Sequence, residues 1–214
     1  MDILYSDSDI LVVNKPPGLA TTPGGWDKET SLFEILAADH GRLWVVHRLD
    51  KVTSGLVVFA RNAAAHRNLN HLFEHHTIHK VYHVIVVGAP AWDEHTARHP
   101  LRIDVGHSHR TIVDHGNGKS SETYFHLLER FDGYALLAAI PSTGRTHQVR
   151  VHASALGFPL LGDTLYNAPK TDLIPRPALH AFSLEFSLGN KPFNFTAPYP
   201  EDLIQAQKML RAGH

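Results

Sequence analysis

Short runs of β-branched and aromatic residues recur along the chain, and turn residues separate one run from the next. Runs of this length and composition predict strands. The predicted strands cover residues 10–13, 44–49, 55–60, 81–87, 123–129, 134–140, 179–188 and 193–196. Asp132-Gly133 separates two of these runs and predicts a hairpin turn. Strands therefore outnumber helices and often follow one another directly.

Three further stretches carry the signals of helices. Ser31 followed by Glu34 forms a capping box ahead of a helix over about 32–38. Asn62 is a suitable cap for a helix to about Glu74, and Thr146 for one to about 156. The pattern predicts an α+β fold with a mixed, largely antiparallel β-sheet core and flanking helices. Because no linker or break in composition appears, residues 1–214 are expected to form a single domain.

Composition excludes several classes of protein. Hydrophobic residues make up 43% of the 214 residues and charged residues 19%, an ordinary globular mixture. No apolar run approaches the roughly 20 residues that span a bilayer, and the first residues do not resemble a secretory signal. The chain has no cysteine, which excludes disulfides, thiolate metal sites and a cysteine nucleophile. We therefore expect a cytoplasmic protein with no membrane contact.

The charge balance alone argues against a nucleic-acid partner, because the net charge is −1 and the pI about 7.0. The distribution of charge weakens that argument. Between Arg42 and Lys80 there are six lysines and arginines and six histidines, against two acids. On charge alone, solvated faces remain the simpler interpretation.

The stretch from His47 to Leu56, HRLDKVTSGL, is a candidate for chemistry. If it begins as a strand, His47 and Leu49 share one face, while Arg48 and Asp50 share the other. Asp50 then falls where the strand gives way to a turn, facing a cleft or solvent. Taken alone, an Asp that initiates a turn is the simpler reading, since Asp commonly bonds backbone N–H groups there.

A second stretch, STGRTHQVRVH from Ser142, places an arginine just before a predicted helix. Gly144 permits a sharp turn. The positive end of a helix dipole disfavours a cation at Arg145, so a carboxylate partner is expected. That partner would make either a surface ion pair of little energetic value, or a catalytic carboxylate that the arginine keeps ionised.

The two stretches together resemble the signature motifs of the RluA-like RNA pseudouridine synthases. HRLDKVTSGL is similar to the family's catalytic motif, and STGRTHQVRVHASALGFPLLGDTLY to its second large motif. Shorter elements also match in the family's order: NKPPGL at 14–19, Lys80-Val81-Tyr82 and Leu179-His180-Ala181. The resemblance spans residues 10–188. One departure is Pro141-Ser142, where the family usually has an aliphatic residue.

This resemblance implies a pseudouridine synthase catalytic domain and assigns roles to particular residues. Asp50 would be the catalytic carboxylate, Arg145 its salt-bridge partner, and Tyr82 the ring that stacks on the extruded base. Leu179 would buttress the pocket, and Arg48 would occupy the gap that the flipped nucleotide leaves. His47, in the same motif, joins Arg48 and Leu179 as a substrate-binding residue.

The implied reaction only rearranges atoms, so it needs no cofactor or metal. The N1–C1′ bond of uridine breaks and a C5–C1′ bond forms after the base leaves its stack. Asp50 has three routes open to it: attack at C1′, addition at C6, or removal of the 2′ proton. The implied substrates are tRNA and/or rRNA stem-loops. We expect a compact monomer without an obligate protein partner and without the N-terminal S4 RNA-binding module of many relatives.

Two alternatives come from other classes of protein. A non-catalytic RNA-binding protein of the same fold would not require Asp50, Tyr82 and Arg145 together. A metal-dependent hydrolase would use the histidines of His75-His76-Thr77-Ile78-His79 and His107-Ser108-His109. Neither an HExxH motif nor paired acidic motifs accompany these histidines, so no metal site is expected.

Overall fold

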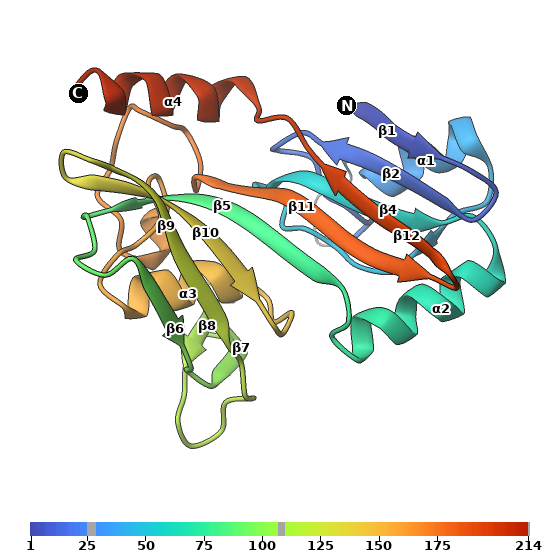
Figure 1. Cartoon of the computed structure of the whole chain (residues 1–214), viewed down its shortest axis with the longest axis horizontal. Coiled ribbons are helices and arrows are strands. Elements are labelled where there is room, and N and C mark those ends of the chain that lie inside the picture. The colour runs from blue at the N-terminus through green and yellow to red at the C-terminus, as the bar shows by residue number, and fades with distance from the viewer. Residues whose placement is uncertain (25–28, 107–109, 214) are drawn as a thin grey trace. The chain divides into compact units, whose positions relative to one another are not determined.

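The computed structural model describes residues 1–24, 29–106 and 110–213, which form two compact units (Figure 1). The first unit contains Met1–Lys80 and Ala181–Pro200, and the second contains Val81–His180 and Glu201–His214. The chain thus leaves the first unit within one strand, returns to it within another, and ends in the second unit. Whether both units fold together as the expected single domain stays a prediction.

The first unit is built on antiparallel strands. β1 (Asp2–Ser6) pairs with β2 (Ile10–Lys15), β2 with β4 (Ser54–Ala60), and the short β3 (Trp44–Val45) with the end of β4. β11 (Leu179–Leu188) follows β4 in the strand order and pairs with β12 (Lys191–Thr196). All seven residues of β4 are buried, in keeping with its continuous apolar sequence.

Both helices of the first unit begin where the sequence predicts. In α1 (Leu32–His40), the Ser31 hydroxyl accepts from the Glu34 backbone N–H, and the Glu34 carboxylate accepts from the Ser31 N–H at 2.9 Å. In α2 (Ala63–Glu74), the Asn62 side chain accepts from the Ala65 N–H at 2.8 Å. These caps satisfy backbone donors that the first turn of a helix leaves unpaired.

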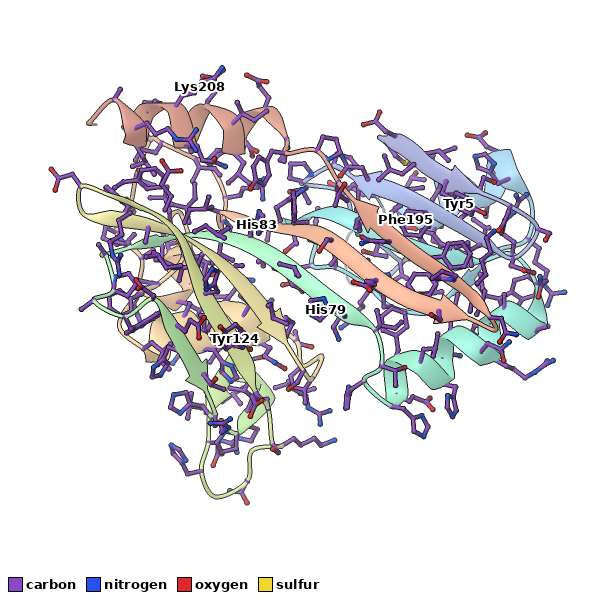
Figure 2. All side chains as sticks on the ribbon, in the orientation of Figure 1. Tyr5, His79, His83, Tyr124, Phe195 and Lys208 are labelled. Atoms are coloured by element: carbon purple, nitrogen blue, oxygen red, sulfur yellow. The ribbon has the colours of Figure 1, made fainter. Side chains whose placement is uncertain are left out.

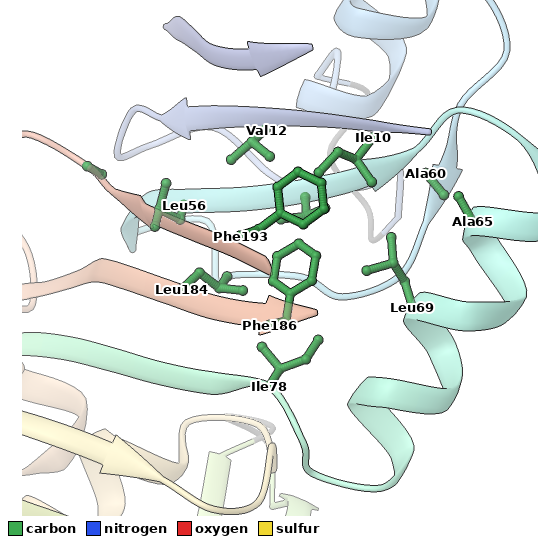
Figure 3. Packing of buried hydrophobic residues seen from close by; sticks show 12 residues of the cluster. Ile10, Val12, Leu56, Ala60, Ala65, Leu69, Ile78, Leu184, Phe186 and Phe193 are labelled. Atoms are coloured by element: carbon green, nitrogen blue, oxygen red, sulfur yellow. The ribbon is translucent and has the colours of Figure 1, made fainter. Parts of the chain in front are cut away.

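Apolar side chains from strands far apart in sequence form the core of the first unit (Figure 3). Ile10 and Val12 of β2 and Leu56 of β4 are completely buried in this cluster. Phe186 and Phe193 stack with ring centroids 5.3 Å apart on the β11–β12 pair. Gly55 allows the backbone of β4 to lie against the backbone of β11 at Ala181. Its φ is +112°, and a Cβ there would overlap the Ala181 backbone.

The second unit holds the remaining strands, again in antiparallel pairs. β5 (His79–Val87) pairs with β10 (Tyr134–Pro141), β10 with β9 (Thr123–Phe131), and β9 with β6 (Glu94–Ala97). β7 (Leu101–Val105) and β8 (Arg110–Val113) form a separate pair. The predicted hairpin around Asp132-Gly133 is confirmed as the β9–β10 turn.

Three helical segments complete the second unit: α3 (Gln148–Ala155), the 3₁₀ turn Thr164–Tyr166 and α4 (Glu201–Arg211). Arg150 of α3 forms a buried two-pronged ion pair with Asp163, with N–O distances of 2.6 and 2.8 Å. Arg176 holds Asp202 of α4 in the same way, at 2.7 and 2.9 Å. The α+β class and the mostly antiparallel mixed sheet expected from the sequence are confirmed.

Two boundaries within the motifs differ from the prediction. The strand predicted over 44–49 ends at Val45. The helix predicted from Thr146 begins at Gln148, and its N-cap is His147 in a left-handed conformation (φ 55°) without a side-chain cap bond. Thr146 is therefore not the cap, and the prediction of this helix start was wrong.

Candidate active site

The segment between β3 and β4 has no regular secondary structure, yet its backbone is tied down. The register of β3 on β4 would next place Val46 opposite Val58. The Val58 N–H instead donates to the ring Nε2 of His47 at 3.0 Å. A side chain thereby replaces a backbone partner, and the ladder ends at Val45. This substitution frees the chain to turn away from the sheet just before Asp50.

Leu49 is the first anchor of this segment. Its N–H donates to the Thr21 hydroxyl oxygen at 3.1 Å, and its carbonyl accepts from the same hydroxyl at 2.9 Å. Both residues are buried, with exposed fractions of 6% and 2%. Because one hydroxyl satisfies both backbone groups, the residue before Asp50 is held as firmly as in a strand.

Lys15 anchors the other side of Asp50. Its side chain is fully buried, and its Nζ donates to the carbonyls of Pro16, Leu19 and Lys51 at 2.9, 2.8 and 3.2 Å. The Lys51 carbonyl also accepts from the Gly18 N–H at 2.8 Å. The NKPPGL turn and the turn after Asp50 are thereby joined through one ammonium group, a charge-assisted and hence strong connection.

Asp50 itself opens a turn closed by a hydrogen bond from the Thr53 N–H to its carbonyl at 3.0 Å. Its side chain is half-buried. Of the two residues before Asp50, Leu49 is buried and Arg48 is exposed, so burial alternates as the sequence pattern predicts. Asp50 therefore combines an immobilised backbone with a half-buried side chain, which suits a group that must meet a substrate atom at a defined point.

His47 is a neutral ring. Burial lowers its pKa to about 3, and the nearby Lys80 charge contributes in the same direction. Since Nε2 accepts a hydrogen bond, the proton of the neutral ring lies on Nδ1. The ring also stacks on Phe73 of α2, with centroids 4.6 Å apart. His47 thus supports the segment that carries Arg48 and Asp50, and it brings no positive charge to RNA.

In the second unit, Tyr82 and Leu179 belong to one apolar cluster. Tyr82, on β5 opposite Ala139 of β10, is half-buried, and Leu179 is 5% exposed. The neighbouring His83 (Figure 2) has its pKa lowered to about 4, mainly by burial and further by the His180 charge. This part of β5 therefore provides an aromatic face in surroundings that disfavour charge.

Arg145 lies on the loop between β10 and α3. Its N–H donates to the side-chain oxygen of Gln148 at 3.1 Å, and the Gln148 N–H donates back to the Arg145 carbonyl at 3.1 Å. Its Nε is buried and has no hydrogen-bond partner in the described part of the chain. A buried guanidinium donor without an acceptor favours an incoming anion, because an unsatisfied donor costs roughly 1–3 kcal/mol.

The six predicted site residues thus divide evenly between the units. His47, Arg48 and Asp50 lie in the first unit, and Tyr82, Arg145 and Leu179 lie in the second. The structure brings the first three together on one tied segment, and Tyr82 and Leu179 together in one cluster. The salt bridge between Asp50 and Arg145 stays a prediction.

Sequence reasoning missed Lys15, Thr21 and Gln148, which hold the two motif segments. Lys15 gave a usable signal in the sequence. A lysine at the end of an apolar strand is normally exposed, but Lys15 is followed directly by a Pro-Pro-Gly turn. Gln148 gave a weaker one, as a polar residue at the start of a helix of otherwise buried positions. Thr21 gave none.

The histidine clusters are the candidate metal ligands of the hydrolase alternative. Among residues 1–24, 29–106 and 110–213, no group of three or more His, Asp or Glu side chains is arranged to hold a metal ion. The His107–His109 cluster lies outside the described residues. No helix in the described part of the chain is long and apolar enough to cross a membrane.

The fold is that of pseudouridylate synthase domains. A solved structure titled human RNA Pseudouridylate Synthase Domain Containing 1 superimposes with a TM-score of 0.79 over 98% of this chain and 94% of that one, at 28% identity. Human RNA Pseudouridylate Synthase Domain Containing 4 gives a TM-score of 0.81 over 98% and 92% of the two chains, at 24% identity.

The sequence comparisons give the family. The family model for RNA pseudouridylate synthases matches residues 9–155. An uncharacterized RNA pseudouridine synthase of Bacillus subtilis is 37% identical over 99% of this chain and 73% of its own. Ribosomal large subunit pseudouridine synthase D of Zymomonas mobilis is 34% identical over 98% of this chain and 73% of its own.

The chain therefore belongs to the RNA pseudouridylate synthase family, as the motif resemblance to RluA-like enzymes implied. It is an isomerase that acts on RNA. The expected enzyme class and the expected kind of substrate are confirmed by this membership.

Proposed function

We propose that this enzyme isomerises specific uridines in structured RNA, in tRNA and/or rRNA stem-loops, with Asp50 as its catalytic carboxylate. The observation that carries this proposal is the pair of anchors on either side of Asp50. Thr21 holds Leu49, and Lys15 holds Lys51, so the backbone on both sides of the half-buried Asp50 is immobilised. An exposed turn whose Asp served only to initiate it would not need two buried anchors.

The reaction balances without a co-reactant. The N1–C1′ bond breaks, the uracil rotates, and a bond forms between C5 and C1′; C5 loses one proton and N1 gains one. Asp50 enters by attack at C1′, addition at C6 or removal of the 2′ proton. All three routes require an ionised carboxylate, and a cation such as Arg145 close to Asp50 would favour that state.

The remaining residues act on the extruded base and the strand it leaves. Tyr82 stacks on uracil, and Leu179 backs the same apolar surface, which keeps water from the detached base. Stacking of a base on an aromatic ring contributes about 1–3 kcal/mol. Arg48 is exposed next to Asp50 and fills the gap in the RNA stack. His47, neutral and buried against Phe73, contributes shape and the direction of Arg48.

Exposed arginines of the first unit supply contacts to the RNA backbone. Arg42 and Arg67 are exposed, and neither forms an ion pair with an acidic side chain in the described ranges. By contrast, Arg98, Arg130 and Arg211 in the second unit pair with acids.

The names of several relatives, ribosomal large subunit pseudouridine synthase D, favour rRNA over tRNA as the substrate. We place this activity in the cytoplasm and assign it to a monomer.

Mapping of pseudouridine across the host's RNAs, with and without the gene, tests the proposed substrate. Loss of one or a few pseudouridines in rRNA or tRNA stem-loops is expected. The purified protein should then modify a stem-loop that contains such a position, with chelator present throughout. If RNA binds but no pseudouridine forms, the protein is a binding protein of this fold. Activity only after metal is added would favour the hydrolase-like histidine chemistry.

A further inference from the structure

Gln148 occupies a position that the proposed chemistry leaves unexplained. The side chain is only 4% exposed, although amides are seldom buried so fully. Its oxygen accepts from the Thr143 hydroxyl at 2.7 Å and from the Arg145 N–H at 3.1 Å. Its nitrogen donates to the Glu122 carbonyl at 2.9 Å and to the Thr123 hydroxyl at 3.0 Å. All four hydrogen-bonding positions of the amide are used.

These four bonds join the arginine loop to the sheet. Glu122 and Thr123 lie at the start of β9, whereas Thr143 and Arg145 belong to the loop after β10. Gly144, between the two loop residues, has no neighbouring atom within 4 Å of a Cβ built on it. Hydrogen bonds hold the loop on both sides of this glycine: Ser142 and Thr143 bond the Glu122 backbone directly, and Gln148 bonds Thr143 and Arg145.

The bonds from Gln148 meet Arg145 at its backbone. The Gln148 side-chain oxygen accepts from the Arg145 N–H, and the Gln148 backbone N–H donates to the Arg145 carbonyl. The Nε of Arg145 lacks a partner in the described ranges. Gln148 consequently fixes the position of the backbone from which the guanidinium extends.

A chain of hydrogen bonds extends from Gln148 through Thr123 and His152 to the His99 carbonyl. The Thr123 hydroxyl contacts His152 Nδ1 at 2.9 Å, and His152 Nε2 contacts the His99 carbonyl at 3.1 Å. Burial lowers the pKa of His152, so the ring is neutral. With its proton on Nε2, His152 accepts at Nδ1 from Thr123, and Thr123 accepts from the Gln148 amide. One arrangement of protons satisfies the whole chain, which makes the Gln148 side chain rigid.

We propose that Gln148 is a positioning residue for the reaction: it holds the Arg145 backbone so that the guanidinium points where an anion must be met. This inference rests on the proposed role of Arg145. Misplacement of a catalytic group by about 1 Å can lower a rate about 100-fold. Loss of Gln148's bonds should therefore affect the chemical step more than the binding of RNA.

The test compares two glutamines. Gln148→Met keeps the length and burial of the side chain and removes all four bonds. Gln207→Met is the matched control: Gln207 lies in the same unit, is also 4% exposed, and its side-chain nitrogen has no partner among the described residues. We expect a single-turnover rate on saturating RNA that is about 10- to 100-fold lower in Gln148→Met. RNA affinity should stay within about threefold of wild type, and Gln207→Met should match wild type in both measurements.

A further variant separates positioning from stability. Thr123→Val removes one acceptor of the Gln148 nitrogen and the hydroxyl bond to His152, but leaves both bonds of the Gln148 oxygen. We expect it to lower the melting temperature, with a much smaller loss of rate below the transition than Gln148→Met shows. A rate loss that simply follows the loss of stability across both variants would overturn the positioning role.

Arg145→Lys, measured alongside, keeps the two proposals distinguishable. If Arg145→Lys is inactive and Gln148→Met turns over within twofold of wild type, only the role of Gln148 is wrong. If Arg145→Lys keeps full activity, the role of Arg145 in the proposed function is wrong, and Gln148 has nothing to position.

Discussion

Asp50 is a single carboxylate on a segment held at both ends by buried bonds, and its replacement is the most direct test at the residue scale. Asp50→Asn keeps the shape and removes the negative charge. We expect essentially no pseudouridine formation, because all three routes need a carboxylate. RNA affinity and the melting temperature should change little, since the anchors bind the backbone of the neighbouring residues. More than about a tenth of wild-type turnover would contradict the assignment.

Lys15 contributes to the same segment through stability. Lys15→Met removes the buried ammonium to which three partly buried backbone carbonyls bind. Because buried acceptors left without donors are costly, the free energy of unfolding should fall by about 2–4 kcal/mol. Chemical denaturation measures this loss. Lys208→Met, at an exposed position on α4 (Figure 2), is the control and should be nearly neutral.

The same replacement links the anchor to catalysis. Lys15→Met should also slow single turnover, because the turn that follows Asp50 loses one of its two fixed points. Unchanged stability together with unchanged rate would mean that water or another side chain replaces the ammonium, and that the turn does not depend on Lys15.

Among the secondary-structure elements, α2 with the adjoining β3 is the place to test contacts to the RNA backbone. Arg42 lies 4.6 Å above the Trp44 ring, and Arg67 is exposed on α2. If both meet phosphates, the double replacement Arg42→Gln/Arg67→Gln should reduce the slope of log affinity against log salt by about 0.7–0.9 per arginine. Filter binding over a range of salt concentrations measures it.

A matched arginine provides the control for this slope. Arg98 is exposed and paired with Glu122 at 2.6 Å, so Arg98→Gln should leave the slope unchanged. Turnover at saturating RNA should also survive the double replacement, since neither residue lies in the segment that carries Asp50. An unchanged slope in the double variant would show that the arginines face only solvent.

The elements also show what sequence could and could not predict. The caps of α1 and α2 and the β9–β10 turn depend on residues within four positions of one another, and they were predicted correctly. The strand over 44–49 was predicted too long, because the Val58 N–H bonds the His47 ring and not the backbone of that segment. That contact joins residues 11 positions apart, and no local pattern contains it.

The candidate site follows the same division. Motif resemblance supplied Asp50, Tyr82 and Arg145, whereas the residues that hold them came only from the structure. The Thr21 hydroxyl meets Leu49 28 positions away, and the Gln148 amide meets Glu122 26 positions away. Such bonds depend on how strands meet in space, so propensity and periodicity carry no information about them. Strands β1, β6, β7 and β8 and helix α4 were not predicted at all.

For the whole molecule, two histidines with lowered pKa values contribute to the response to acid. Burial lowers the pKa of His47 to about 3 and that of His83 to about 4, from an ordinary value of 6.5. Below pH 6.5, these two histidines therefore bind protons in the unfolded chain but stay neutral in the folded chain until the pH approaches their lowered pKa values. Stability from these two rings is complete above that pH and falls as the pH drops toward 4, by at most about 1.4 kcal/mol per pH unit for each ring.

Unfolding measured by urea between pH 7 and pH 4 tests this sign. The variant His47→Gln keeps an acceptor for the Val58 N–H and cannot titrate, so its stability should fall less steeply than that of wild type. Parallel slopes for the two proteins would mean that His47 is protonated without cost in the folded state.

The alternation of the chain between its two units has a consequence for how a ribosome would produce it. Residues 181–200 complete the first unit, and residues 201–213 return to the second. Neither unit is therefore a contiguous piece of the gene, and neither can be cut out as a shorter clone without losing a strand or a helix. During synthesis, the apolar β4 is made more than a hundred residues before β11, its neighbour in the strand order. In a nascent chain, the edge of β4 that faces β11 therefore has no partner strand until β11 has been made.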